Sequence, residues 1–141
     1  MCKSEGMKND VERTVRDYYR IVGDLARTEG ELLEVIDPDA TFVEHPNPIA
    51  PRGVTRGVAE CLAGFRAGRQ LLSDQRIEVL EVLTVGERAA IRATWSGVIG
   101  VDRGPFTAGM ELRCVMAAWA TVRDDRIVEH ETYDCYPPLP I

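Results

Sequence analysis

The chain has 141 residues, of which 45% are hydrophobic and 28% charged, and it carries a formal net charge of −6 at pH 7. This size and composition are typical of a single globular domain that buries its own core. The acidic balance excludes nucleic acid and anionic membranes as primary partners, because both are bound through clustered lysines and arginines.

Cysteine usage and the N-terminal sequence indicate the compartment. The four cysteines show neither the close pairing of a zinc site nor the density of a disulfide framework, so we expect free thiols. The first ten residues lack the apolar segment of a signal peptide, and no stretch approaches the roughly 20 apolar residues of a membrane span. We therefore expect a cytoplasmic protein. The sequence contains no glycine-rich phosphate loop, nucleophile elbow or close metal-ligand spacing, so we expect no cofactor and no metal.

The first quarter of the chain predicts two helices. Residues 1–8 are polar and show no pattern, so we expect a flexible leader. Over residues 9–27, apolar side chains recur at helical spacing and predict the first helix. Thr28 and Glu31 form a capping box that opens a short second helix, and Asp37-Pro38 ends it.

A short strand and a third helix follow. Residues 40–45 predict the strand, and three prolines between positions 46 and 51 prevent regular ladder pairing directly after it. This turn is expected on the surface or over the mouth of a cavity. Apolar residues over 57–70 recur roughly at helical spacing and predict the third helix.

The second half of the chain is typical of β-strands. The expected strands cover residues 75–85, 88–99, 106–123 and 126–136, and a proline-rich tail covers 137–141. In the first of them the polar positions change phase near Leu80, which predicts either burial on both faces or a bulge. Tight turns are expected at Gly86-Glu87 and at Asp124-Asp125.

Helices followed by a long, mostly antiparallel sheet predict one α+β domain over residues 9–136. Three N-terminal helices would pack in a strongly curved, mixed sheet that forms a cone-shaped barrel, whose mouth suits an apolar small-molecule ligand. In the strand over 106–123 the even positions are apolar, whereas the odd positions expose Val115 and Trp119. This pattern predicts a homodimer through the outer face of the sheet.

His45 is the strongest single candidate for chemistry, because it stands between a strand end and a proline-rich loop. A neutral imidazole beside an apolar interior would act as a general base near neutral pH. The alternative is a histidine that caps the turn by a hydrogen bond to a backbone carbonyl. Thr41 and Val43 share its face of the strand.

The last strand carries a second group of candidates. His130, Thr132 and Asp134 share one face, with Glu131 and Tyr133 on the other. His130 and Asp134 lie roughly 13 Å apart along the strand, too far for a direct catalytic pair. Each is a candidate acid or substrate-orienting group, and the alternative is a half-solvated strand face.

Tyr18 lies on the apolar stripe of the first helix, where its hydroxyl could donate a hydrogen bond to a developing oxyanion. The alternative is a core tyrosine bonded to a carbonyl. Tyr19 points about 100° away around the helix and is the weaker candidate. The candidate pocket walls are Trp95, Met116, Ala118 and Thr132.

Four segments share their order and spacing with a known superfamily. They are VRDYY at 15–19, DPDATFVEHP at 37–46, RGV at 56–58 and DDRIVEHETYD at 124–134. Through them nearly the whole chain resembles the nuclear transport factor 2-like superfamily, which includes ketosteroid isomerases and SnoaL-like polyketide cyclases. The resemblance implies a cone-shaped α+β barrel with an internal hydrophobic pocket and isomerase, cyclase or lyase chemistry.

The resemblance also implies roles for single residues. Ketosteroid isomerases place their general base, an aspartate, directly before the proline that ends this strand, and His45 holds that place here. Tyr18 best matches their oxyanion-hole tyrosine, whereas their oxyanion-hole aspartic acid would fall near Ala117 or Ala118. Asp134 lies nearest to the catalytic carboxylate of cyclase-like relatives.

These observations predict a cofactor-free enzyme that transfers a proton on an apolar, carbonyl-bearing small molecule. His45 would be the base, Tyr18 the hydrogen-bond donor, and His130 or Asp134 an acid or orienting group. Two alternatives are a binding module that holds an apolar ligand without turnover and a dimeric protein-interaction scaffold. A large dry pocket would separate the first two from the third, and pH-dependent turnover would separate the enzyme from the binding module.

Overall fold

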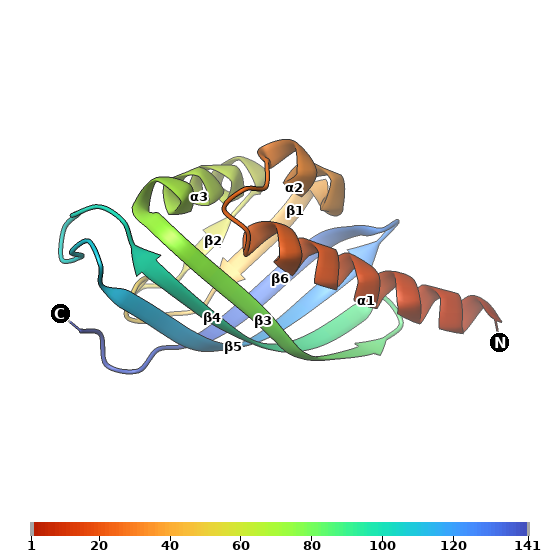
Figure 1. Cartoon of the computed structure of the whole chain (residues 1–141). Coiled ribbons are helices and arrows are strands. Elements are labelled where there is room, and N and C mark those ends of the chain that lie inside the picture. The colour runs from red at the N-terminus through yellow and green to blue at the C-terminus, as the bar shows by residue number, and fades with distance from the viewer. Residues whose placement is uncertain (1, 141) are drawn as a thin grey trace.

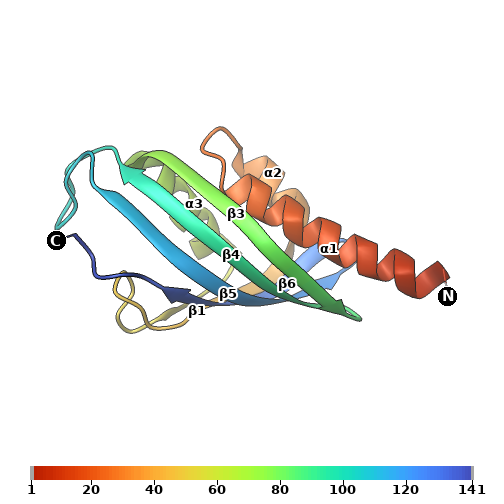
Figure 2. The same ribbon diagram turned by 60° about the horizontal axis from the view of Figure 1, so that its bottom comes forward.

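A computed structural model describes residues 2–140 of the chain, apart from the side chains of residues 2–5 and 7–9. Within this range three helices lie on one side of a six-stranded sheet (Figures 1 and 2). The helices are α1 (Cys2–Val22), α2 (Glu29–Val35) and α3 (Val58–Leu71). The strands are β1 (Ile36–Glu44), β2 (Val54–Arg56), β3 (Leu72–Val85), β4 (Arg88–Ile99), β5 (Glu111–Arg123) and β6 (Arg126–Cys135).

The sheet is mixed and open. Its strand order is β2-β1-β6-β5-β4-β3, so β2 and β3 are the two edges. The β1–β6 pair is parallel, and every other neighbouring pair is antiparallel. Long, curved strands wrap around the helices (Figure 2). The predicted α+β class and the cone-shaped arrangement of helices within a curved sheet are confirmed.

The helix ends follow local chemistry, although not always at the predicted residue. The predicted capping box is present, because Thr28 Oγ1 accepts a hydrogen bond from the Glu31 N–H at 3.2 Å. The first helix was predicted over residues 9–27, but α1 already includes residues 2–8 and ends at Val22. The chain leaves the helix at Gly23, which packs against β3, where a Cβ atom would lie 3.0 Å from Ile77 Cβ.

The strands also follow the predicted pattern with informative differences. The register of β3 with β4 shifts between Val79 and Glu81, so the bulge, one of the two predicted alternatives near Leu80, is confirmed. The strand predicted from residue 106 begins only at Glu111, since residues 100–110 form a loop in which Asp102 accepts a hydrogen bond from the Ala108 N–H.

The main core lies between α1 and the sheet. Val11 and Val15 of α1 are buried, and four alanines of β4 and β5 are buried in the same cluster: Ala89, Ala93, Ala118 and Ala120. These small side chains leave room for α1 to pack close to the strands. None of the helices in the described part of the chain combines the length and the apolar character needed to cross a bilayer.

Candidate functional site

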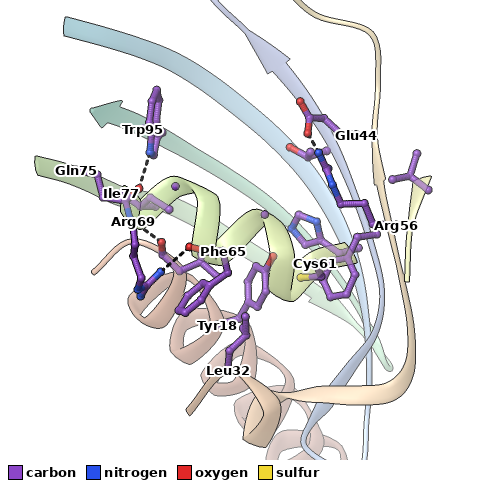
Figure 3. Close-up of a pocket in the computed structure, with 17 residues that line it drawn as sticks. Tyr18, Leu32, Glu44, Arg56, Cys61, Phe65, Arg69, Gln75, Ile77 and Trp95 are labelled. Carbon is purple, nitrogen blue, oxygen red and sulfur yellow. Dashed lines mark hydrogen bonds and ion pairs between the residues drawn. The ribbon is translucent and has the colours of Figure 1, made fainter. Parts of the chain in front are cut away.

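A cavity of about 370 Å³ lies between the helices and the curved sheet (Figure 3). Its walls are largely apolar or aromatic and include Leu32, Phe42, Phe65, Ile77 and Trp95. A few polar side chains interrupt these walls, as is usual for small-molecule sites. The polar groups come from α1, α3 and strands β1, β2, β3, β4 and β6, so segments far apart in the sequence build one site.

His130 and Tyr19 form the most buried polar contact of this site. His130 lines the cavity from β6, is 8% exposed, and has its Nε2 atom 2.7 Å from the Tyr19 hydroxyl. Burial disfavours the charged imidazole and lowers the pKa of His130 to about 4. The ring is therefore neutral at pH 7, and its tautomer decides whether Nε2 donates to the Tyr19 hydroxyl or accepts from it.

Tyr18 stands beside this pair. Its ring centroid lies 5.2 Å from that of His130 and 6.2 Å from that of Phe42. Burial is the main cause that raises the pKa of Tyr18 well above its usual value, so the hydroxyl keeps its proton. Figure 3 shows Tyr18 rising from α1 toward the cavity.

Two polar atoms of this group are open to the cavity. Among the side chains that the structure describes, Thr84 Oγ1 is the only fully buried nitrogen or oxygen without a hydrogen-bond partner, so any other atom without a partner is at least partly accessible. The Tyr18 hydroxyl and His130 Nδ1 have no partner in the described part of the chain and belong to cavity-lining residues. Both atoms are therefore accessible from the cavity and can bond to a ligand.

An ion pair borders the cavity where β1 meets β2. Arg56 donates a hydrogen bond to Glu44 Oε1 at 3.0 Å, and the Asn47 side-chain amide donates to Glu44 Oε2 at 2.8 Å. Glu44 and Arg56 both line the cavity. Because the two charges offset each other, this border is polar without a strong net charge.

A hydrogen-bonded chain fixes another wall. Trp95 Nε1 donates to Gln75 Oε1 at 3.0 Å, and Gln75 Nε2 donates to the carbonyl of Val22 at the end of α1 at 2.9 Å (Figure 3). The indole packs over Gly97, where a Cβ atom would lie 2.6 Å from Trp95 Cζ2. The ring thus has a defined position, and Trp95 lines the cavity.

His45 lies outside this cavity. Its Nε2 atom is 2.8 Å from Glu131 Oε2, and its ring stacks on Tyr133 with the centroids 4.2 Å apart. In the parallel β1–β6 pair Phe42 is opposite His130, so His45, three residues after Phe42, shares the other face of the sheet with Glu131. The predicted base would have to face the cavity, and His45 does not.

The other predicted residues fall into three groups. Tyr18, His130, Trp95 and Thr132 line the cavity. Asp134 accepts a hydrogen bond from Thr132 Oγ1 at 2.6 Å, and burial raises the pKa of its carboxyl, but it is not among the lining residues. Met116 and Ala118 were predicted as pocket walls, but they belong to the packed core beside α1 instead.

Tyr19, the weaker of the two tyrosine candidates in the sequence, is the one that contacts His130. Tyr18 and Tyr19 are both buried, 7% and 5% exposed, because α1 is covered over a wide arc by the sheet and the other helices. The signal available in the sequence was the adjacent aromatic pair itself. Among the residues that the structure describes, no three His, Cys, Asp or Glu side chains gather closely enough to hold a metal ion.

Comparisons with known proteins agree with this architecture. The sequence profile of the SnoaL-like domain matches residues 15–130. No curated protein sequence matches the chain significantly. Similar solved structures include IdmH, a proposed polyketide cyclase from Streptomyces antibioticus, with a TM-score of 0.71 and 24% identity over 88% of this chain and 91% of that one.

Two further structures extend the likeness. A proposed SnoaL-like polyketide cyclase from Jannaschia sp. has a TM-score of 0.72 and 16% identity over 91% of this chain and 87% of that one. A protein of ketosteroid isomerase-like fold from Catenulispora acidiphila, in complex with trimethylamine, has a TM-score of 0.66 and 16% identity over 85% of this chain and 83% of that one. At these identities the likeness concerns the fold.

Proposed function

We propose, from the premise that the chain belongs to the SnoaL-like domain family, that it is a cofactor-free enzyme that transfers a proton on an apolar, carbonyl-bearing small molecule. The reaction would take place in the internal cavity. One observation carries the proposal: a neutral, buried His130 and a protonated Tyr18 hydroxyl both open to a largely apolar cavity of about 370 Å³.

Each polar group has a definite part in this proposal. The Tyr18 hydroxyl donates a hydrogen bond to the substrate carbonyl oxygen and stabilises the negative charge that develops there. His130 Nδ1 accepts the proton from the carbon next to the carbonyl and returns it to the product. Tyr19 holds Nε2 at 2.7 Å and positions the ring for this transfer.

The pKa of His130 limits its share of the rate. A ring with a pKa of about 4 is neutral at pH 7 but is a weak base. Much of the acceleration would therefore come from Tyr18, whose hydroxyl acts in a largely apolar cavity. This division predicts that activity depends more strongly on Tyr18 than on His130.

The cavity dimensions support a small ligand. Its volume of about 370 Å³ lies toward the lower end of the roughly 300 to 1,000 Å³ usual for small-molecule sites. At about 30 Å³ per water molecule the space equals roughly a dozen waters, which suits a compound of one or two rings.

Two alternatives follow from specific observations. The weak basicity of His130 favours a binding module that holds an apolar ligand without turnover. Val115 and Trp119, which are 54% and 46% exposed, favour a homodimer or protein-interaction scaffold formed through the outer face of the sheet. The homodimer and the cytoplasmic location stay predictions, and sedimentation of a Trp119→Glu variant against the natural chain would test the first.

Hydrogen–deuterium exchange at carbon tests the enzyme proposal without knowledge of the natural substrate. 1-Tetralone, a two-ring ketone with exchangeable protons beside its carbonyl, is incubated in D₂O with the protein and followed by NMR. We expect the protein to accelerate exchange, Tyr18→Phe to lose most of that acceleration, and His130→Gln to lose a smaller part of it. His45→Gln is the matched control and should keep it. Binding of 1-tetralone without faster exchange would support the binding module instead.

A further inference from the structure

Two glycines interrupt the middle of α3. Gly64 and Gly68 stand four residues apart on the 14-residue helix, and both line the cavity. Glycine inside a helix destabilises it relative to alanine, because glycine loses more backbone freedom on folding. Residues four apart lie on the same face of a helix, about 6 Å apart along its axis. The two glycines therefore leave a trough without side chains on the cavity side of α3.

Neither packing nor backbone conformation accounts for these glycines. A Cβ atom added at Gly64 or Gly68 would meet no heavy atom within 4 Å, and neither residue has the positive φ that favours glycine. Gly23 is different, because a Cβ atom there would lie 2.9 Å from the Tyr19 carbonyl oxygen. The fold would accept alanine at both positions of α3, so the space beside them is open.

A second observation points to a ligand in this space. Tyr18 is 7% exposed and lines the same cavity, and its hydroxyl has no hydrogen-bond partner among the residues that the structure describes. Cys61, one turn before Gly64 on α3, is near enough to influence the pKa of Tyr18. The trough on α3 and the available hydroxyl on α1 therefore border one volume, and Figure 3 shows Tyr18 directed toward α3.

We infer that Gly64 and Gly68 form a binding floor for a flat, apolar ring of the ligand, with an oxygen on that ring hydrogen-bonded to Tyr18. The ligand class is a planar aromatic or conjugated ring compound that carries a carbonyl or hydroxyl oxygen. A methyl group at either glycine would occupy the space of the ring. This inference deepens the proposed function and rests on it for the location of the reacting carbonyl.

The test separates helix stability from ligand affinity. Gly64→Ala and Gly68→Ala should each raise the melting temperature of the free protein by about 3 to 4 °C, because alanine favours the helix. The same variants should bind 1-tetralone about tenfold or more weakly by calorimetry, since one methyl group in a fitted site has an effect of this size. A purely structural role would not produce higher stability together with weaker binding.

Two control variants match these substitutions. Gly6→Ala makes the same change in α1, where a Cβ atom also meets nothing within 4 Å and the residue lies outside the cavity. It should leave the affinity for 1-tetralone unchanged. Ala67→Gly changes an exposed residue of α3 and should lower the melting temperature while the affinity stays within twofold, which excludes helix stiffness as the cause.

The outcomes distinguish this inference from the proposed function. If the natural chain and both α3 variants bind 1-tetralone equally, the binding floor is refuted even when proton exchange is observed. If the natural chain binds the ketone and the α3 variants do not, the floor is supported, and an absence of exchange would then refute the enzyme proposal alone. If the natural chain binds neither 1-tetralone nor the three-ring ketone 9-fluorenone, both proposals are refuted.

Discussion

Lowering the pH should destabilise the protein through His130. The folded ring titrates at a pKa of about 4 because it is buried, whereas an imidazole in the unfolded chain titrates near 6.5. Between these two values the unfolded chain binds more protons than the folded chain, so the free energy of unfolding falls as the pH falls. The contribution of His130 is fully present above about pH 6.5 and is lost progressively down to about pH 4.

The magnitude follows from the two pKa values. The two pKa values differ by about 2.5, so complete loss of the His130 contribution lowers the free energy of unfolding by about 3 kcal/mol. Between pH 7 and pH 5 the same linkage gives about 2 kcal/mol. Because His130 is only 8% exposed, solvent screening reduces this figure little. The loss would be a large part of the total stability of a domain of this size.

Urea unfolding at pH 7 and pH 5 measures the effect. The natural chain should lose about 2 kcal/mol more over this interval than His130→Gln, in which the Gln amide keeps a polar partner for Tyr19. His45→Gln removes the other of the two histidines in the chain and should retain the pH dependence that His130 causes. Equal pH dependence in the natural chain and in His130→Gln would refute the assignment of a buried, neutral ring.

Three further predictions concern neighbouring residues. Tyr19→Phe leaves His130 Nε2 without its partner and should lower the free energy of unfolding by about 1 to 2 kcal/mol in urea; a loss below about 0.3 kcal/mol would mean that the bond contributes little. Tyr18→Phe removes a hydroxyl that is open to the cavity, so stability should change by less than about 0.5 kcal/mol while proton exchange on 1-tetralone is largely lost. A large loss of stability would show instead that the Tyr18 hydroxyl makes a hydrogen bond that stabilises the fold. Gly97→Ala places a Cβ atom 2.6 Å from Trp95 Cζ2, so it should cost about 1 to 3 kcal/mol and shift the tryptophan emission, whereas unchanged emission would contradict the ring position.

Local signals in the sequence were sufficient for most of the fold. The capping box of Thr28 and Glu31, the bulge at Leu80 and the turn at Asp124-Asp125 all depend on residues within a few positions of each other. Both turn aspartates adopt positive φ, 54° and 61°, which Asp tolerates better than most residues. Such features could be predicted because their chemistry is complete within one short segment.

The face of the sheet on which His45 lies depends on strand parity and not on the motif. The motif placed it correctly at the end of β1, but in a strand the orientation of a side chain depends on its parity with the buried residues. Ala40 and Phe42 are 2% and 6% exposed, so even positions face the core, and Glu44 rather than His45 lines the cavity. The large apolar Phe42 was the better guide to orientation than the proline that follows the strand.

The contact between Tyr19 and His130 could not be derived from sequence patterns. These residues are separated by 111 positions, and their contact depends on where α1 crosses the sheet. It also depends on the parallel pairing of β1 with β6, which brings Phe42 opposite His130. Periodicity fixes which side of each element is buried, but it does not fix which two buried residues meet.

In a crystal structure of the protein with 1-tetralone bound, we expect the ketone inside the cavity, with its carbonyl oxygen within about 3.2 Å of the Tyr18 hydroxyl and its carbon skeleton within reach of His130. A ketone bound on the other face of the sheet beside His45 and Glu131, with the cavity unoccupied, would contradict the proposed function.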